Sequence, residues 1–347
     1  MHAASLPSAS GTSNGKPSPL RLRLVVEHEL RGVRIDSFLM KHLRNYTRYR
    51  LQRMVQAGLV KANDSTAALD QRVYRGQRIE ITLIEPPDKL LQPEAGPLDV
   101  LFEDAWIVVL NKPPGMVAHP AADTQQKTLI NRLQWHLDRQ TPLPGLLRPG
   151  IVHRLDRETS GVMVTTKHHL PHSRLGEQFE RGRVSKAYLA LVEGVIERNE
   201  GTIDLPIGRV AAGDSILMSA KADAREAKPS RTRFEVVRRF AAHTLVRAIP
   251  LSGRQHQIRI HLAESGHPVV GDEFYGPFGA IKRQRGEPDL RAAPSALGTV
   301  SPLIARHALH AERLGFTHPV TEDWLEFTAP LPGDFERALA QLDGPVP

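Results

Sequence analysis

The chain has 347 residues, of which 40% are hydrophobic and 24% charged, a balance typical of folded globular proteins. It contains no cysteine, which excludes disulfides, zinc–thiolate sites, iron–sulfur clusters and thiol nucleophiles and is typical of a cytoplasmic protein. No apolar run is long enough for a membrane-spanning helix, so no membrane association is expected. At this length, two domains can each bury a core of their own.

The formal net charge of +8 is concentrated near the start of the chain. Residues 21–84 hold 13 Lys and Arg against 6 Asp and Glu, an excess of seven positive charges. Such a localised basic surface is typical of a module that binds a polyanion. Binding to an anionic membrane is not favoured, because no hydrophobic anchor lies beside the basic region. Residues 1–20 are rich in Ser, Gly and Pro and are predicted to be a disordered tail.

The elements expected in the first folded unit follow from hydrophobic periodicity. Residues 22–26 and 79–83 alternate like strands, and residues 35–43 and 51–57 have apolar residues at helical spacing, the second helix ending near Gly58. Four arginines fall largely away from the apolar helix faces and are free to meet phosphates: Arg44, Arg48, Arg50 and Arg53. A solvated basic helix is the alternative interpretation of the same pattern.

Short motifs in this unit carry a resemblance. They are Arg34-Ile35-Asp36, Tyr46-Thr47-Arg48, Gly58-Leu59-Val60 and the run 75–79. In this order and spacing they resemble the alpha-L RNA-binding domain, which occurs in a small-subunit ribosomal protein and in several RNA-modifying enzymes. The resemblance implies a small α/β RNA-binding domain over residues 21–84, with Arg48, Arg50 and Arg53 on the RNA-facing helix.

A Pro-rich linker is predicted at residues 85–98, and a second domain at residues 99–345. Its strands and helices are irregularly interspersed, which predicts an α+β fold with a mixed or antiparallel sheet. A helix is expected at 129–137 and a long surface loop at 275–302. Strands are expected at 107–110, 162–165, 187–192, 244–249 and 257–260.

The most informative run is 153–161, His-Arg-Leu-Asp-Arg-Glu-Thr-Ser-Gly, which places Asp156 between two arginines. A carboxylate beside cations stays ionised and can act as a nucleophile or base. The structural alternative is an Arg–Asp pair that stabilises a turn. Asp156 and Glu158 do not by their spacing imply the separation of roughly 5 to 9.5 Å that a glycosidase pair requires.

Three further runs stand out in the same domain. Residues 111–120 contain Pro and Gly and indicate a rigid loop after a strand. Tyr188 lies in the run 185–192, where a lone aromatic residue is ordinarily a packing residue. In the run 253–261, interpreted as a strand, Arg259 lies on the polar face and is placed to pair with a buried carboxylate.

These four runs, in this order, together with 306–311 near the end, resemble the RluA-type pseudouridine synthases. The resemblance extends from about Leu22 to Phe335. Two departures, Gln255 in place of a usual Thr or Ser and Ala227 in place of a usual Gly, bear on local RNA contacts and leave the catalytic set intact.

The resemblance implies a pseudouridine synthase domain with a central active-site cleft. Asp156 is implied to be the nucleophile or base, Arg259 its partner, and Tyr188 the residue that packs against the target base and takes part in proton transfer. Arg154 is implied to occupy the gap left by a flipped nucleotide, and Arg254 to contact RNA. The expected substrate is large-subunit (23S-type) ribosomal RNA or a precursor particle, acted on by a monomer without cofactor or metal.

Three alternatives stay open at this point. One is a non-catalytic RNA-binding factor of ribosome assembly that retains the fold. A second is a pseudouridine synthase that acts on tRNA, and a third is an RNA glycosidase that stops after cleavage. A histidine cluster, His168, His169 and His172, has no carboxylates at ligand spacing, so no metal site is expected.

Overall fold

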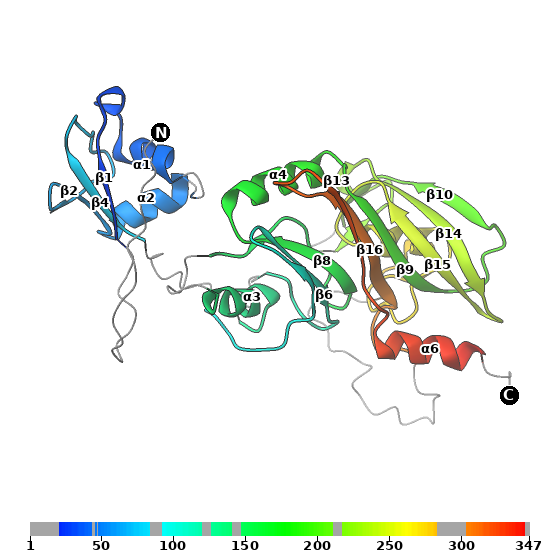
Figure 1. Cartoon of the computed structure of the whole chain (residues 1–347). Helices are drawn as coiled ribbons and strands as arrows, with labels where there is room; N and C mark the ends of the chain where they lie inside the picture. The colour runs from blue at the N-terminus through cyan, green and yellow to red at the C-terminus, as the bar shows by residue number, and fades with distance from the viewer. Residues whose placement is uncertain are drawn as a thin grey trace. The chain divides into compact units, whose positions relative to one another are not determined.

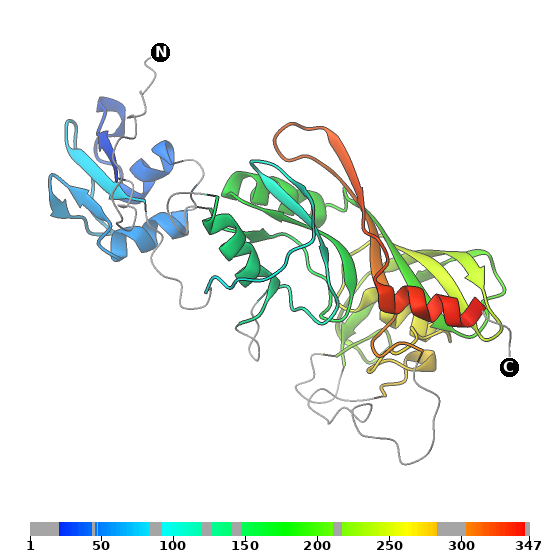
Figure 2. The same ribbon diagram turned by 60° about the horizontal axis from the view of Figure 1, so that its bottom comes forward.

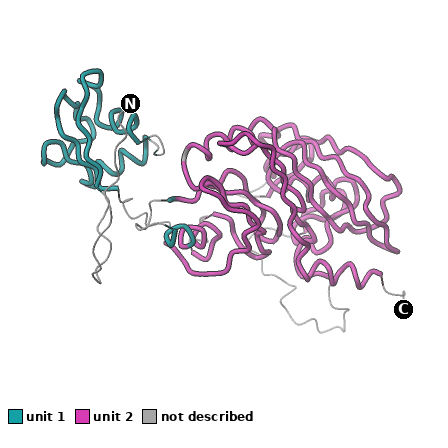
Figure 3. The backbone as a smooth tube through the Cα atoms, in the orientation of Figure 1, with its two compact units in different colours: residues 1–88, 136–147 teal, residues 89–135, 148–347 magenta. Residues whose placement is uncertain are grey.

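The computed structural model describes residues 21–43, 46, 48–83, 92–119, 126–140, 147–210, 217–282 and 303–343. The chain forms two compact units, one of Met1–Asp88 with His136–Leu147 and one of Lys89–Trp135 with Arg148–Pro347 (Figure 3). The predicted tail and the first part of the linker lie outside the described residues. No helix in the described ranges combines the length and apolar character needed to cross a membrane.

The N-terminal unit is a four-stranded antiparallel sheet, in the order β1-β4-β2-β3, with helices packed on it (Figure 1). The predicted alternation is confirmed, because Leu22 pairs with Ile81 and Leu24 with Ile79, with both isoleucines buried. Both predicted helices are also present. The elements are β1 (Arg21–Val25), η1 (His28–Leu30), α1 (Ile35–His42), α2 (Arg48–Gln56), β2 (Val60–Ala62), β3 (Ser65–Thr66) and β4 (Arg78–Thr82).

The second unit is built on a ten-stranded sheet whose main path runs β10-β14-β15-β9-β16-β8-β6-β5. Only the pairing of β16 with β8 is parallel among the described strands. The prediction of a mixed or antiparallel sheet is therefore confirmed, and the sheet is mixed. Its strands are β5 (Val100–Glu103), β6 (Ile107–Lys112), β7 (Gly150–Ile151), β8 (Ser160–Thr166), β9 (Ser185–Glu193), β10 (Glu200–Asp204), β14 (Arg231–Arg239), β15 (His243–Pro250), β16 (Leu309–Thr317) and β17 (Trp324–Thr328).

Helices and a small accessory sheet complete the second unit. The helix α6 lies across the strands of the main sheet (Figure 2) and packs into the core through Phe335 and Ala338. Helix α3 (Leu129–Asp138) begins in the second unit, and its residues from His136 on belong to the first. The remaining elements are α4 (His169–Glu180), β11 (Ile207–Arg209), β12 (Met218–Ser219), β13 (Arg225–Lys228), α5 (Gln257–Glu264), η2 (Pro277–Gly279) and α6 (Gly333–Asp343).

Two predictions for this unit were wrong. Residues 257–260 form the start of helix α5 and not a strand, and every residue from Gln257 to Ala263 is buried. A helix that is enclosed on all sides can place polar and apolar residues at any position. The alternation of polar and apolar residues in this segment was therefore not a sign of a β-strand. The segment from Tyr275 does not begin as a surface loop either, because Tyr275 is 1% exposed; residues 283–302 lie outside the described residues.

Gly161 fixes the strand that follows the run 153–161. It has a positive φ of 117°, and a Cβ there would lie 2.2 Å from the carbonyl oxygen of Ala311 on β16. Only glycine permits this approach, which seats the start of β8 against β16 in the parallel pair. The loop that carries Asp156 is thereby anchored at its carboxyl end to the centre of the sheet.

Candidate active site

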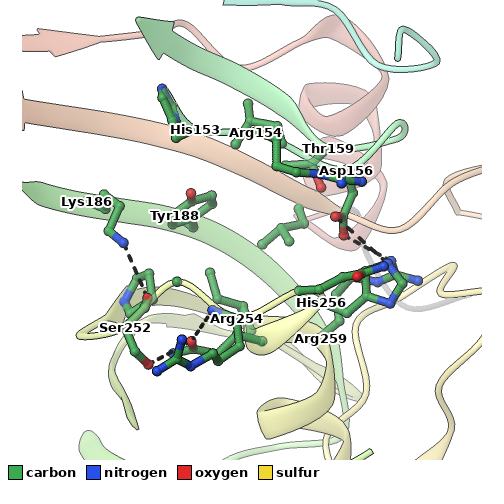
Figure 4. A pocket seen from close by; sticks show the side chains of 17 residues that line it. His153, Arg154, Asp156, Thr159, Lys186, Tyr188, Ser252, Arg254, His256 and Arg259 are labelled. Atoms are coloured by element: carbon green, nitrogen blue, oxygen red, sulfur yellow. Dashed lines mark hydrogen bonds and ion pairs between the residues drawn. The ribbon is translucent and has the colours of Figure 1, made fainter. Parts of the chain in front are cut away.

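The run 153–161 opens onto a cavity of about 380 Å³ in the second unit (Figure 4). The loop before β8, strand β9, the loop between β15 and α5, and α5 itself supply its walls. Asp156 is the one acidic side chain among the described residues that line it. Its lining includes four basic side chains: Arg154, Lys186, Arg254 and Arg259.

Asp156 meets Arg259 directly in this cavity. Arg259 donates a hydrogen bond from Nη1 to Oδ2 of Asp156 at 3.1 Å. The Asp156 side chain is 20% exposed and the Arg259 side chain 2% exposed, so the carboxylate faces the cavity and the guanidinium lies behind it. The pairing expected from the sequence is present, although a helix and not a strand brings Arg259 there.

Arg259 has a second and closer partner, Asp272, which sequence reasoning missed. Asp272 accepts two hydrogen bonds from Arg259, at 2.6 Å from Nε and 2.8 Å from Nη2, and its side chain is fully buried. It also accepts the backbone N–H groups of Phe274 and Tyr275. This bidentate pair fixes the guanidinium plane and leaves Nη1 for Asp156.

The electrostatics keep Asp156 ionised. Burial raises the pKa of its carboxyl, but the neighbouring His256 and Arg259 outweigh burial and hold the pKa well below its usual range. Burial also lowers the pKa of His256, so Arg259 is the lasting positive charge beside Asp156 at neutral pH. For Asp272, burial is likewise outweighed by Arg259, and the pKa falls to about 2.

The backbone of the Asp156 loop is held from two sides. Lys112, buried at the end of β6, donates from Nζ to the carbonyls of Pro113, Met116 and Arg157 at 2.8, 3.0 and 3.1 Å. Arg306 donates to the carbonyl of Glu158 at 2.9 Å. The run 111–120, in which sequence analysis found only a rigid loop, thus contributes a side chain that ties two loops together.

The far end of the cavity holds Tyr188, Lys186 and His153 (Figure 4). Burial, and then the charge of Asp156, raises the pKa of Tyr188, so its hydroxyl keeps its proton at neutral pH. Burial lowers the pKa of Lys186, which donates to the carbonyl of Ser252 at 3.3 Å. His153 stacks on Phe179 at 4.4 Å and accepts the backbone N–H of Val164.

Five of the nine predicted site residues therefore line one cavity. They are Asp156, Tyr188, Arg259, Arg154 and Arg254. Three of the others lie on α2 of the N-terminal unit, and Arg44 lies outside the described residues. Arg48 is 56% exposed there, the Arg50 guanidinium lies 4.2 Å from the Tyr46 ring centroid, and that of Arg53 lies 6.0 Å from the Tyr49 ring centroid.

Metal ligation has no support in the described ranges. Across them, no three His, Asp or Glu side chains gather as a metal ion would require. In the predicted histidine cluster, the His168 ring contacts the Trp106 ring edge-on at 5.7 Å. The described residues that line the cavity include an ionised carboxylate, a protonated phenol and several cations.

Comparison with known proteins places this arrangement in a family. Residues 106–264 match the RNA pseudouridylate synthase family. The uncharacterized RNA pseudouridine synthase YlyB of Bacillus subtilis is 35% identical over 93% of this chain and 98% of its own length. Ribosomal large subunit pseudouridine synthase D of Neisseria meningitidis serogroup A is 36% identical over 96% of this chain and 84% of its own length.

The chain belongs to the RNA pseudouridine synthase family. Human RNA pseudouridylate synthase domain containing 4 has the same fold, with a TM-score of 0.55 and 27% identity over 70% of this chain and 92% of that one. The resemblance to RluA-type enzymes is confirmed, and the chain is an enzyme that acts on RNA. The alternative of a non-catalytic RNA-binding factor was wrong.

Proposed function

We propose that this enzyme isomerises selected uridines to pseudouridine in large-subunit ribosomal RNA, with Asp156 as its nucleophile or base. The RNA class is supported by relatives named ribosomal large subunit pseudouridine synthase D that match nearly the whole chain. The observation that carries the site is the cavity in which Asp156 is the one acidic lining residue among those described and is ionised by Arg259.

The reaction breaks the bond between N1 of uracil and C1′ of ribose and forms a bond between C5 and C1′. The C5 proton is lost and N1 gains a proton, so atoms balance without an oxidant, a reductant or a group donor. Asp156 initiates the cleavage, and Arg259 holds its carboxylate in place. A fixed cation behind the reacting carboxylate keeps it charged without a barrier from solvent reorganisation.

Tyr188 serves the released base in this proposal. Its position on β9, lining the same cavity, supports stacking against uracil, since aromatic side chains stabilise flipped bases by stacking. Because the Tyr188 hydroxyl is protonated at neutral pH, it can accept the C5 proton only while it donates its own proton to another acceptor. Proton transfer at Tyr188 is therefore a concerted step in this mechanism.

Extraction of the uridine from its stack requires positive charge at the mouth of the cavity. Arg154 and Arg254 are exposed and line it, and flipping a nucleotide costs a few kcal/mol that phosphate contacts offset. We assign Arg154 to the gap left by the flipped nucleotide and Arg254 to the adjoining RNA. Both assignments place the target ribose between the exposed arginines and Asp156.

The rest of the chain is assigned to substrate delivery. Residues 21–84 act as the alpha-L RNA-binding domain, with Arg44, Arg48, Arg50 and Arg53 toward RNA; residues 85–98 are the linker and 99–345 the catalytic domain. The basic excess of residues 21–84 supports this assignment. The enzyme works as a cytoplasmic monomer on ribosomal RNA or on a precursor particle.

The test is tritium release from ribosomal RNA labelled at C5 of uridine, with the wild type and Asp156→Asn assayed side by side. Release by the wild type alone supports the isomerase with Asp156 as its essential carboxylate. Release from tRNA but not from ribosomal RNA or precursor particles moves the substrate to tRNA. Accumulation of free uracil in place of pseudouridine reveals a glycosidase and contradicts the proposal.

A further inference from the structure

His256 occupies a strained position at the wall of the cavity. It precedes α5 with a left-handed backbone, φ 56° and ψ 16°, a conformation that is strained for a non-glycine residue. Its side chain is 9% exposed and its ring lies parallel to the Phe274 ring at 6.3 Å. Such strain persists where surrounding contacts enforce it, and it clusters at functional sites.

Tyr275 determines which nitrogen of His256 carries the proton. The Tyr275 hydroxyl is buried, accepts the backbone N–H of Met218 at 3.3 Å and lies 2.7 Å from Nδ1 of His256. Within the described residues the hydroxyl has no other polar contact. If Nδ1 carried a proton, the phenolic hydrogen would be buried without an acceptor among the described residues, which is unfavourable. The hydroxyl therefore donates to Nδ1.

The consequence is a single N–H group aimed at Asp156. A neutral imidazole that accepts at Nδ1 carries its proton on Nε2. Nε2 of His256 lies 3.9 Å from Oδ1 of Asp156, whereas Oδ2 of the same carboxylate accepts from Arg259. The charged groups around the ring are Asp156, Asp272, Arg154 and Arg259. The two carboxylate oxygens of Asp156 thus face different donors.

We propose that Tyr275 and His256 form a positioning pair, in which Tyr275 fixes the Nε2–H form of His256 so that this N–H directs Oδ1 of Asp156 toward the target nucleotide. The inference rests on the proposed function for what Asp156 does, and on hydrogen bonds of the free enzyme for the tautomer. Hydrogen bonds at catalytic groups are often long without substrate and shorten in the complex, so the 3.9 Å separation closes when RNA binds.

The first measurement needs no RNA. In protein labelled with ¹⁵N at its 16 histidines, the wild type is expected to show His256 protonated on Nε2 and unprotonated on Nδ1, with the signal assigned by its loss in His256→Gln. Tyr275→Phe keeps the ring and removes the proton donor, so a mixture of both tautomers is expected. Nδ1 protonation in the wild type, or unchanged populations in Tyr275→Phe, overturns the inference.

The second measurement links the tautomer to turnover. Tyr275→Phe is expected to lower kcat about tenfold with KM nearly unchanged, the loss equivalent to one orienting hydrogen bond. His256→Gln retains an N–H near the position of Nε2 and is expected to exceed His256→Leu in kcat by a similar factor. Unfolding curves of each variant identify any loss that comes from destabilisation.

The matched control is Ser230→Ala. Ser230 is buried, and its hydroxyl lies 3.2 Å from Nε2 of His261, a histidine on α5 that does not line the cavity. Its variant is expected to leave kcat unchanged. An equal loss of kcat in Ser230→Ala and Tyr275→Phe overturns the positioning role. A wild type without isomerase activity overturns the proposed function, and the tautomer populations then decide the inference by themselves.

Discussion

Each unit of this protein pairs a carboxylate with arginine, and the two pairs differ in which partner is buried. In the N-terminal unit, Asp36 is fully buried whereas Arg34 and Arg48 are 44% and 56% exposed. In the catalytic unit, Arg259 is 2% exposed whereas Asp156 is 20% exposed. In the N-terminal pair the carboxylate is buried and positive charge is exposed to a ligand. In the catalytic pair the arginine is buried and the negative charge of the carboxylate is exposed.

The consequence follows from which partner is enclosed. Asp36 accepts from Gln52 at 2.8 Å and from the backbone N–H of Ser37, so it ties α1 to α2 and presents its arginines to solvent. Burial raises the pKa of Asp36, but the hydrogen-bond donors and the arginines lower it by more. The net pKa is therefore lowered, and Asp36 stays charged. Cations at a surface attract RNA phosphates, whereas a carboxylate held in a cavity by a buried cation is suited to chemistry.

The largest effect is expected for Asp156→Asn. If Asp156 is the nucleophile or base as proposed, removal of its charge should lower kcat about 10⁴-fold or more, equivalent to about 5 kcal/mol, with little change in RNA affinity. Single-turnover tritium release and filter binding measure the two quantities. The matched variant Asp36→Asn should lower stability and leave kcat within about twofold; equal losses of kcat would remove the distinction between the two carboxylates.

The next largest effect is expected for Asp272→Ala, which should lower the free energy of unfolding. It leaves the buried guanidinium of Arg259 without its bidentate partner, and breaking a buried ion pair from one side costs about 3–5 kcal/mol. Urea unfolding measures the loss. The control Asp204→Ala breaks an ion pair with Arg231 whose partners are 56% and 55% exposed, and it should cost less than about 1 kcal/mol.

Acid should weaken the catalytic unit before the N-terminal unit. Burial lowers the pKa of both His153 and His307 to about 3, from 6.5 in an unfolded chain. The unfolded chain gains protons below about pH 6.5 while these two rings stay neutral in the fold, so the unfolding free energy falls as the pH drops from 6.5 toward 3. From pH 6.5 to 4.5, each histidine contributes at most about 2–3 kcal/mol.

Hydrogen exchange resolves this effect by region. Amides of β8 should lose protection between pH 6.5 and 4.5, whereas the contribution of Asp36 to the N-terminal unit, with a lowered pKa, is lost only below about pH 3.8. The His307 ring is hydrogen-bonded to Thr159, directly before β8, so the variant His307→Gln should reduce the pH dependence there. An unchanged dependence in that variant would contradict the assigned cause.

The smallest effect is expected for Arg48→Ala. Loss of one phosphate contact should reduce the slope of log binding constant against log salt concentration by about one, with a stability cost below about 1 kcal/mol. Titrations of RNA at several salt concentrations provide the slope. Arg23→Ala on β1 is the control, because Arg23 is 81% exposed but paired with Glu80; a slope equal to wild type in Arg48→Ala would contradict RNA contact by α2.

Much of the architecture was predictable because its signals are local. The alternation of Leu22 and Leu24 predicted β1, and the apolar face of Leu51, Met54 and Val55 predicted α2. The strands β6, β8, β9 and β15 also lie where their apolar runs indicated. In each case, residues close in sequence face one side of the element, so the pattern needs no knowledge of the rest of the fold.

The site was predictable only in part. Asp156, Tyr188 and Arg259 were found through motifs, and the structure brings all three to one cavity. Asp272 was missed, although one signal existed: a carboxylate directly after the apolar run Val269-Val270-Gly271. The tie from Lys112 to the Asp156 loop had no local signal, because its acceptors are backbone carbonyls, one of which lies 45 residues away.

By itself, the sequence determined the basic N-terminal unit and a mixed or antiparallel sheet, because charge and periodicity are carried by neighbouring residues. It pointed to Asp156 through the resemblance of the run 153–161 to RluA-type synthases. Tertiary structure decided that residues 257–264 form a helix, since a fully enclosed segment gains nothing from a period of two. It also decided that Arg259 is shared by Asp272 and Asp156. A buried cation requires partners from distant segments, and only the folded chain brings those segments together.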